Sequence, residues 1–278
     1  MPEYLPAYAS ESLRRFLAAW KEDFRLLHLS MRGIGMLTGM PGIFEALIET
    51  DEAKDGDSAK EKLKKDLVEA KDEGKLAAEE CAKGFPLLHA HTLVATWGAF
   101  EAAIEDTLVK ILLNEPKLLK NQAFTKVKIP LAEFQASDEE GRIRYLLNEI
   151  TRNQGPGRKQ GVDMFESLLD FLALSGAVQE DLKKTIWEMQ HVRNVIVHRA
   201  SCADKRLLEG CPWLNLKIGE KVTVSHDALG RYGAALCQYA LNIAHRLCER
   251  YGVDPQARIR AFNEQREKEG SLSTCEDF

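Results

Sequence analysis

The stretch from Ile186 to Ser201 concentrates the side chains of this chain that could do chemistry. It reads Ile-Trp-Glu-Met-Gln-His-Val-Arg-Asn-Val-Ile-Val-His-Arg-Ala-Ser, so an arginine, an amide and two histidines interrupt an apolar helical pattern. An imidazole titrates near neutral pH and can move a proton, while a guanidinium can hold an anionic group. The stretch therefore predicts a site for proton transfer beside a bound anion.

A helical wheel at about 100° per residue divides this stretch into two faces. One row is apolar apart from its arginine: Leu182, Ile186, Met189, Arg193 and Ile196. The opposite row is aromatic and polar: Trp187, His191, Asn194 and His198. Because an unpaired buried guanidinium is very costly, Arg193 needs a carboxylate or a polar cleft. The candidate partners lie on the helix expected over 87–114: Glu101, Glu105 and Asp106.

The polar row has both a functional and a structural interpretation. Asn194 and His198 are four residues apart, so the amide can fix the orientation and tautomer of the imidazole. Such a face could meet a second copy of the same helix around a two-fold axis. In the structural interpretation, Trp187 belongs to the core, His191 lies at the surface and His198 is a hydrogen-bonded structural histidine.

Composition and charge exclude several classes of protein. The chain has 278 residues, of which 45% are apolar, and a formal net charge of −5. An acidic chain has no global basic surface, so any contact with nucleic acid needs a local patch. No apolar stretch reaches the roughly 20 residues of a membrane helix, and no signal peptide is expected at the N-terminus. We expect a soluble protein without a membrane partner.

The cysteines predict a reducing compartment. Six are present, without a Cys-x-x-Cys pair or a regular spacing: Cys81, Cys202, Cys211, Cys237, Cys248 and Cys275. This pattern argues against a disulfide framework and against a zinc ribbon. We therefore expect free thiols, a cytoplasmic location and neither metal nor cofactor.

Hydrophobic periodicity predicts a chain of helices. Helices are expected over 10–29, 43–50, 59–83, 87–114, 138–152 and 162–174, then from about 180 through the opening stretch, and from Ser225 to just before Gly252. Glycines and a proline between 33 and 42 are expected to break the first helix. Alternating residues over 214–218 and 221–224 predict a small β-hairpin. We divide the chain into a helical N-terminal appendage (1–84), a helical domain (85–252) and a polar tail (253–278).

The segment from Arg193 to His198 has an arginine, a polar residue directly after it and a histidine after four intervening positions. This arrangement resembles the signature of the higher eukaryotes and prokaryotes nucleotide-binding (HEPN) superfamily. Residues 97–101 (Trp-Gly-Ala-Phe-Glu) are similar to the family's long first helix. Residues 204–212, which lead into the expected hairpin and last helix, resemble its stand-alone defence and toxin-type branch. The resemblance covers about residues 85–252.

The resemblance implies an all-α, HEPN-like bundle that cleaves RNA without a metal ion, in defence or growth control. His198 would be the general acid or base, Arg193 would hold the phosphate, and Asn194 would orient His198 or bond the phosphate. Arg193 and His198 point apart on an ideal wheel. The site therefore needs a distorted helix end, an Arg193 side chain that bends around the helix, or a homodimer formed through this helix that supplies one of the two residues. Any neutralising partner protein stays open.

Several other residues are weaker candidates. Arg199, Arg158 and Lys159 could guide RNA phosphates, together with Arg142, Arg144 and Arg152, although a solvated loop explains 152–159 equally well. Trp187, His191 and Glu101 are expected to support the site. His89 and His91 are expected at the surface. The alternative function is a non-catalytic HEPN domain that binds RNA or nucleotide or acts as a dimerising adaptor, and a purely structural helical protein is a third possibility.

Overall fold

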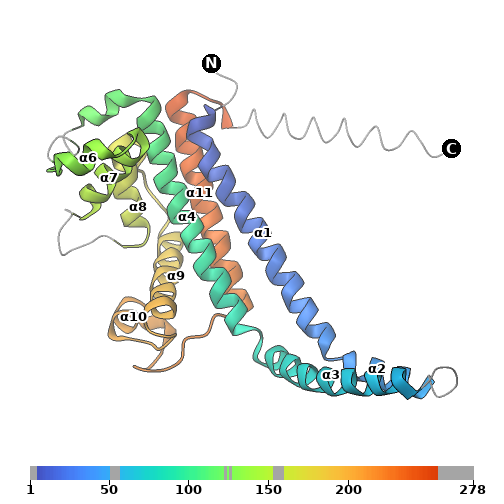
Figure 1. Ribbon diagram of the computed structural model, residues 1–278. Helices are drawn as coiled ribbons and strands as arrows, with labels where there is room; N and C mark the ends of the chain where they lie inside the picture. Colours follow the sequence, from blue (N-terminus) through green and yellow to red (C-terminus); the bar gives the residue numbers. More distant parts are fainter. Residues whose placement is uncertain (1–4, 51–56, 122–123, 125–126, 153–159, 256–278) are drawn as a thin grey trace, which may run out of the picture. The chain divides into compact units, whose positions relative to one another are not determined.

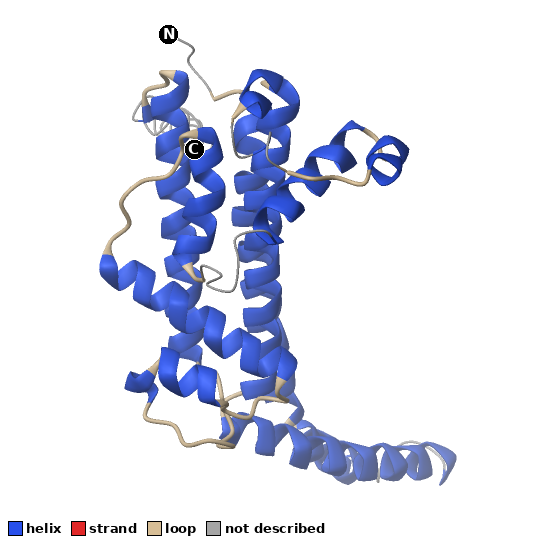
Figure 2. Ribbon diagram, turned by 90° about the vertical axis from the view of Figure 1, so that its left-hand side faces the viewer, coloured by secondary structure: helices blue, strands red, loops and turns tan. Residues whose placement is uncertain are grey.

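The computed structural model describes residues 5–50, 57–121, 124, 127–152 and 160–255, and in this part of the chain the fold is all-α (Figures 1 and 2). The α-helices are α1 (Ala7–Leu37), α2 (Met40–Thr50), α3 (Asp57–Lys83), α4 (Pro86–Asn114), α6 (Leu131–Ala136), α7 (Glu139–Arg152), α8 (Val162–Leu169), α9 (Glu180–His198), α10 (Lys205–Gly210) and α11 (His226–Tyr251). Short 3-10 turns are η2 (Pro116–Lys120), η3 (Asp170–Leu172) and η4 (Pro212–Leu214). Within the described ranges, none of the helices is long and apolar enough to cross a bilayer.

The ends of α11 show how local sequence sets the helix boundaries. The Ser225 hydroxyl accepts a hydrogen bond from the Ala228 amide at 3.1 Å, which caps the first turn as expected. At the other end Gly252 adopts a φ of +66°. The Val253 amide then reaches back to the Cys248 carbonyl at 2.8 Å, closing a Schellman motif.

The described residues form two compact units. Unit 1 contains those of 1–18, 98–190 and 234–278, and unit 2 contains those of 19–97 and 191–233. This division differs from the boundary that the sequence predicts at residue 84. The first turns of α1 belong to unit 1, where the Phe16 ring lies edge-on against Phe100 with centroids 5.1 Å apart. The N-terminal third is therefore shared between both units.

Unit 1 has an aromatic core. The Phe100 ring of α4 also contacts Phe165 of α8, at 5.0 Å between centroids, and Tyr239 of α11, at 5.8 Å. The Tyr239 hydroxyl donates to Glu166 at 2.6 Å, and Arg246 binds the same carboxylate oxygen at 2.7 Å. Large apolar rings and a half-buried ion pair thus hold α8 against α11.

In unit 2, α2 lies along α3, and α10 lies beside the end of α9 (Figure 1). Gly74 lets α3 approach α2 closely, because a Cβ at this position would lie 3.1 Å from the Pro41 side chain. The glycines before residue 38 do not break α1, which continues to Leu37. Only Thr38 and Gly39 then separate α1 from α2.

The predicted β-hairpin over 214–224 is wrong. The structure has a tight turn in which the Glu220 amide donates to the Lys217 carbonyl, with Gly219 at a φ of +81°. The residues after this turn pair with 201–203, through a single antiparallel bridge between Cys202 and Lys221. Residues 212–214 are coiled into η4, so the expected hairpin arm does not begin as extended chain at Leu214.

Candidate functional site

The candidate site is the C-terminal end of α9. Arg193 and Asn194 are half-buried, and Nη1 of Arg193 donates to Oδ1 of Asn194 at 3.1 Å. His198, the last residue of the helix, is exposed to solvent. It follows Arg193 by five residues, about one and a half turns. The helix thus holds the arginine and the amide together and presents the imidazole at its tip.

The buried face of α9 changes direction before it reaches the site. Ile186 and Met189 are fully buried, as the apolar row predicts, but the buried apolar residues that follow are Val192 and Val195. Arg193 therefore lies at the margin of the packed face and only partly inside it. The residue as a whole is half-buried, and Nε of its guanidinium is buried.

His191 is a packing residue in this structure. Only 8% of it is exposed, and a Cβ placed on Gly210 would lie 2.7 Å from Cε1 of the imidazole. The absence of a side chain at Gly210 lets α10 approach the ring. Burial lowers the pKa of His191, although the nearby Asp204 carboxylate opposes the shift. A ring that is almost fully buried supports α9 and is poorly placed to exchange protons with solvent.

The chain beyond His198 turns sharply. Ala200 and Ser201 both adopt left-handed conformations, with φ of 49° and 62°. Two such non-glycine residues in succession store backbone strain. The Ser201 amide nevertheless bonds the Val195 carbonyl at 3.2 Å, so the turn folds back onto the helix end. The chain thus leaves the helical path directly after His198, whereas Arg193 and His198 themselves both belong to α9.

Arg199 reaches the cap of the next helix. Its Nε lies 3.4 Å from Oδ2 of Asp204, and 60% of the side chain is exposed. Asp204 also caps α10 by accepting the Leu207 amide at 2.9 Å. The hydrogen bond from Leu207 lowers the pKa of Asp204, and Arg199 lowers it further. The exposed guanidinium of Arg199, which directly follows His198 in the chain, therefore forms only a long ion pair with the Asp204 carboxylate.

Two of the acidic residues considered as partners of Arg193, Glu105 and Asp106, are bound by another arginine. Arg144 binds Glu105 at 3.0 Å and Asp106 at 2.5 Å, and it also binds Glu140. Glu101 is half-buried on α4. With three carboxylates around it, Arg144 is not available as a free cation for RNA.

The remaining predicted residues divide into two groups. Trp187 is half-buried and lies against Gly161, whose amide donates to Oε1 of Gln190 at 2.6 Å. Trp187 therefore packs against the residue that directly precedes α8. Arg158 and Lys159 lie outside the described residues.

A histidine cluster in unit 2 was missed by the sequence argument. His89 is 1% exposed, which corrects its assignment to the surface, and its Nδ1 lies 3.0 Å from the Val224 carbonyl. The His226 ring lies between His89 and His28, at 5.5 Å and 5.6 Å between centroids. These residues come from α4, α11 and α1, so no local spacing could reveal them. In the described part of the chain, no three His, Cys, Asp or Glu side chains are grouped to hold a metal ion.

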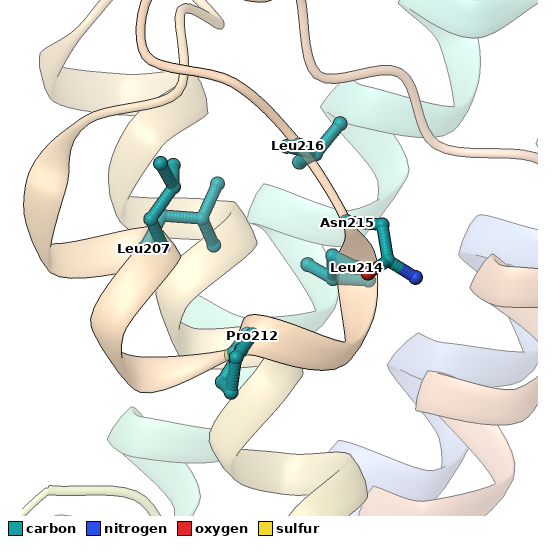
Figure 3. Close-up of a pocket in the computed structure, with 7 residues that line it drawn as sticks. Leu207, Pro212, Leu214, Asn215 and Leu216 are labelled. Atoms are coloured by element: carbon teal, nitrogen blue, oxygen red, sulfur yellow. The ribbon is translucent and has the colours of Figure 1, made fainter.

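A hollow of about 370 Å³ lies beside α10 and η4 (Figure 3). Its walls are mostly apolar: Leu207, Leu208, Cys211, Pro212, Leu214, Asn215 and Leu216. It offers a few polar atoms and no charged side chain. We therefore place the candidate chemistry at the α9 end.

Comparison with known proteins adds no assignment. No family model, curated protein or solved structure matches this chain. The residues at the end of α9 and their geometry are therefore the basis for assigning a function.

Proposed function

We propose that the chain is a metal-independent endoribonuclease of HEPN type, acting as a homodimer in the cytoplasm in defence or growth control. The observation that carries the proposal is the exposed His198 at the tip of α9, one and a half turns beyond the bonded pair Arg193 and Asn194. The site combines a proton-transfer group, a cation and an amide. These are the groups that cleavage of a phosphodiester by an internal hydroxyl requires.

The mechanism uses His198 as the proton-transfer group. As general base, the imidazole takes the proton of a ribose 2′-hydroxyl while the 2′-oxygen attacks the adjacent phosphorus. The 5′-oxygen leaves and receives a proton, so the products are a 2′,3′-cyclic phosphate and a 5′-hydroxyl. Arg193 offsets the charge that accumulates on the phosphoryl oxygens. Asn194 holds the guanidinium through the observed hydrogen bond.

Two copies of the helix would complete the site. Arg193 and His198 point in different directions on one helix, so a single α9 is poorly suited to place both on the same phosphate. A two-fold arrangement of α9 ends would bring Arg193 of one copy towards His198 of the other. The exposure of Val197 (45%), together with that of His198, leaves this helix end open for such a contact.

The test is cleavage of a mixed RNA substrate with a chelator present. We expect His198→Ala and Arg193→Ala each to lower the rate by a factor of at least about 100. His91→Ala removes an exposed histidine of α4 and is the matched control, with an unchanged rate. Equal rates in wild type and both site variants would refute the mechanism.

Complementation tests the shared site directly. If each site combines Arg193 of one copy with His198 of the other, a mixture of the two inactive variants contains dimers with one intact site. Activity should then return in the mixture at a fraction of the wild-type rate. A mixture as inactive as its components would exclude a shared site.

The non-catalytic alternative is favoured by the hydrogen bond between Arg193 and Asn194, which holds the guanidinium beside its own neighbour. In that case the same face would bind RNA or a nucleotide without cleaving it. RNA binding that is weakened by Arg193→Ala, with no cleavage by the wild type, would establish this function.

A further inference from the structure

Positive charge is concentrated in one short part of unit 2. Residues 193–221 contain six Lys or Arg and three Asp or Glu, although the whole chain has a net charge of −5. The six cations are Arg193, Arg199, Lys205, Arg206, Lys217 and Lys221. In an acidic chain, a polyanion needs a local patch of this kind. Lys217 and Lys221 lie beyond η4, in the turn that replaces the expected hairpin.

Backbone hydrogen bonds attach this turn, residues 217–221, to the end of α9. The Ser201 amide donates to the Val195 carbonyl at 3.2 Å, and the Val222 amide donates to the Ser201 carbonyl at 2.7 Å. Through Ser201, the segment that follows the turn is thus bonded to the last turn of the helix, which also carries His198. These bonds set the position of the turn beside the candidate site.

The pairing turns the side chain of Lys221 towards solvent. Lys221 lies opposite Cys202 in an antiparallel bridge, and beside it the Ala203 amide donates to the Glu220 carbonyl at 2.8 Å. Side chains that face each other in such a pair project to the same side, and the next residues project to the other. Ala203 and Val222 are 3% and 7% exposed, whereas Cys202 and Lys221 are exposed. Lys221 therefore lies on the outer surface.

The acidic residues of this part of the chain are engaged in local contacts. Asp204 accepts the hydrogen bond that caps α10, and its other oxygen lies 3.4 Å from Nε of Arg199. The Glu220 carboxylate accepts the first amide of its own turn at 2.9 Å. Glu209 forms a 3.6 Å ion pair with Lys205. Among the described residues 199–221, the exposed cations outside these ion pairs are Arg206, Lys217 and Lys221.

We propose that Lys217 and Lys221 bind backbone phosphates of an RNA strand and guide it to the end of α9. The proposal rests on the proposed function, because the strand held by the turn is the one that His198 would cleave. Lysine contacts to phosphates position a strand without reading its sequence. Ile218, 73% exposed between the two lysines, is an apolar side chain that could instead enter a bilayer. RNA is the favoured ligand because the turn is bonded to the helix whose His198 and Arg193 suit a phosphodiester.

Fluorescence anisotropy with a labelled single-stranded RNA of mixed sequence tests binding apart from cleavage. The full-length protein carries His198→Ala, so that the RNA stays intact. Adding Lys217→Gln and Lys221→Gln should weaken binding and reduce the slope of log K against log salt by about 1.4, since each phosphate contact on a single strand contributes about 0.7. Lys64→Gln with Lys75→Gln removes two exposed lysines of α3 in the same unit and is the matched control, with an unchanged slope. Circular dichroism confirms that both variants stay folded.

Cleavage kinetics separate this proposal from the ribonuclease itself. In protein that keeps His198, the double variant Lys217→Gln, Lys221→Gln should raise KM and leave kcat nearly unchanged, because substrate and transition state lose the same contacts. An RNA affinity and salt slope equal to those of the control would overturn the phosphate contacts, even if the wild type cleaves RNA. So would a wild type that binds phosphatidylserine vesicles through these lysines and does not bind RNA. A wild type that binds RNA through the lysines without cleaving it would keep the phosphate contacts and refute the ribonuclease.

Discussion

The arginines of the two units are held in different ways. In unit 1, Arg246 binds the Glu166 carboxylate at 2.7 Å and the Leu174 and Ala177 carbonyls at 3.1 Å and 3.3 Å. In unit 2, Arg193 donates to the neutral amide of Asn194, and Arg199 is 60% exposed beside Asp204. The first arginine is enclosed by acceptors that match its charge and geometry. The other two keep part of their surface towards solvent.

This difference separates a structural role from a candidate binding role. A buried guanidinium stabilises the fold only when carboxylates and carbonyls compensate its desolvation, and such an arrangement leaves no capacity for a ligand. A half-buried or solvated guanidinium costs the fold little and can accept a phosphate. From the sequence, these residues can be recognised only as arginines in helices or near helix ends. Whether each one is structural or available for a ligand depends on the groups that pack around it.

The largest effect is expected in unit 1. Glu166→Gln removes the charge that compensates Arg246, and both side chains of the pair are less than 15% exposed. The free energy of unfolding should fall by about 3 kcal/mol, measured by urea denaturation. Glu209→Gln, in an ion pair with Lys205 in which both side chains are well exposed, is the control and should change stability by less than about 0.5 kcal/mol. Equal losses would mean that the Glu166 pair is no more structural than a surface pair.

The next effect concerns the support of the candidate site. Gly210→Ala places a Cβ 2.7 Å from the His191 ring, so α10 must move or the imidazole must turn. We expect a loss of about 2 kcal/mol in thermal or urea unfolding. Gly230→Ala in α11 meets no atom within 4 Å and should be neutral or slightly stabilising. An unchanged free energy of unfolding in Gly210→Ala would show that the contact with His191 is loose.

The histidine cluster predicts a pH effect on stability. Burial lowers the pKa of His89, the Val224 carbonyl opposes this shift, and His226 adds to it. Since the pKa in the folded protein is below the ordinary value near 6.5, the unfolded chain takes up the proton first as the pH falls. Stability should therefore be greatest above about pH 6.5 and decrease towards about pH 5. In His89→Asn, stability should fall less as the pH is lowered. An unchanged dependence of stability on pH in this variant would mean that other groups cause the decrease.

The smallest effect on stability is expected at the end of α9. Arg199→Gln breaks a 3.4 Å ion pair whose arginine side chain is 60% exposed, so the free energy of unfolding should change by less than about 0.5 kcal/mol. If Arg199 contacts RNA, the same variant should weaken RNA binding in a salt-titrated assay. A stability loss as large as that of Glu166→Gln would make Arg199 structural and remove the contrast between the units.

The helices were predictable because their signals are local. The periodic stripe of 87–114 became α4, Ser225 caps α11, and Gly252 ends it, so the all-α class is confirmed. The hairpin was wrong because alternation over five residues cannot show which segment supplies the partner. The glycines at 33 and 35 were expected to break the first helix but do not end α1. A glycine weakens a helix by only about 1 kcal/mol, and packing can offset that cost.

The site was only partly predictable. The sequence alone determined that Arg193, Asn194 and His198 share one helix, because helix formation depends on near neighbours. Their roles in RNA cleavage stay a prediction. Only the tertiary structure decided that Arg144 takes Glu105 and Asp106, that His191 packs on Gly210, and that His89 is buried. Burial and charge compensation depend on residues far apart in the chain, which no local spacing records.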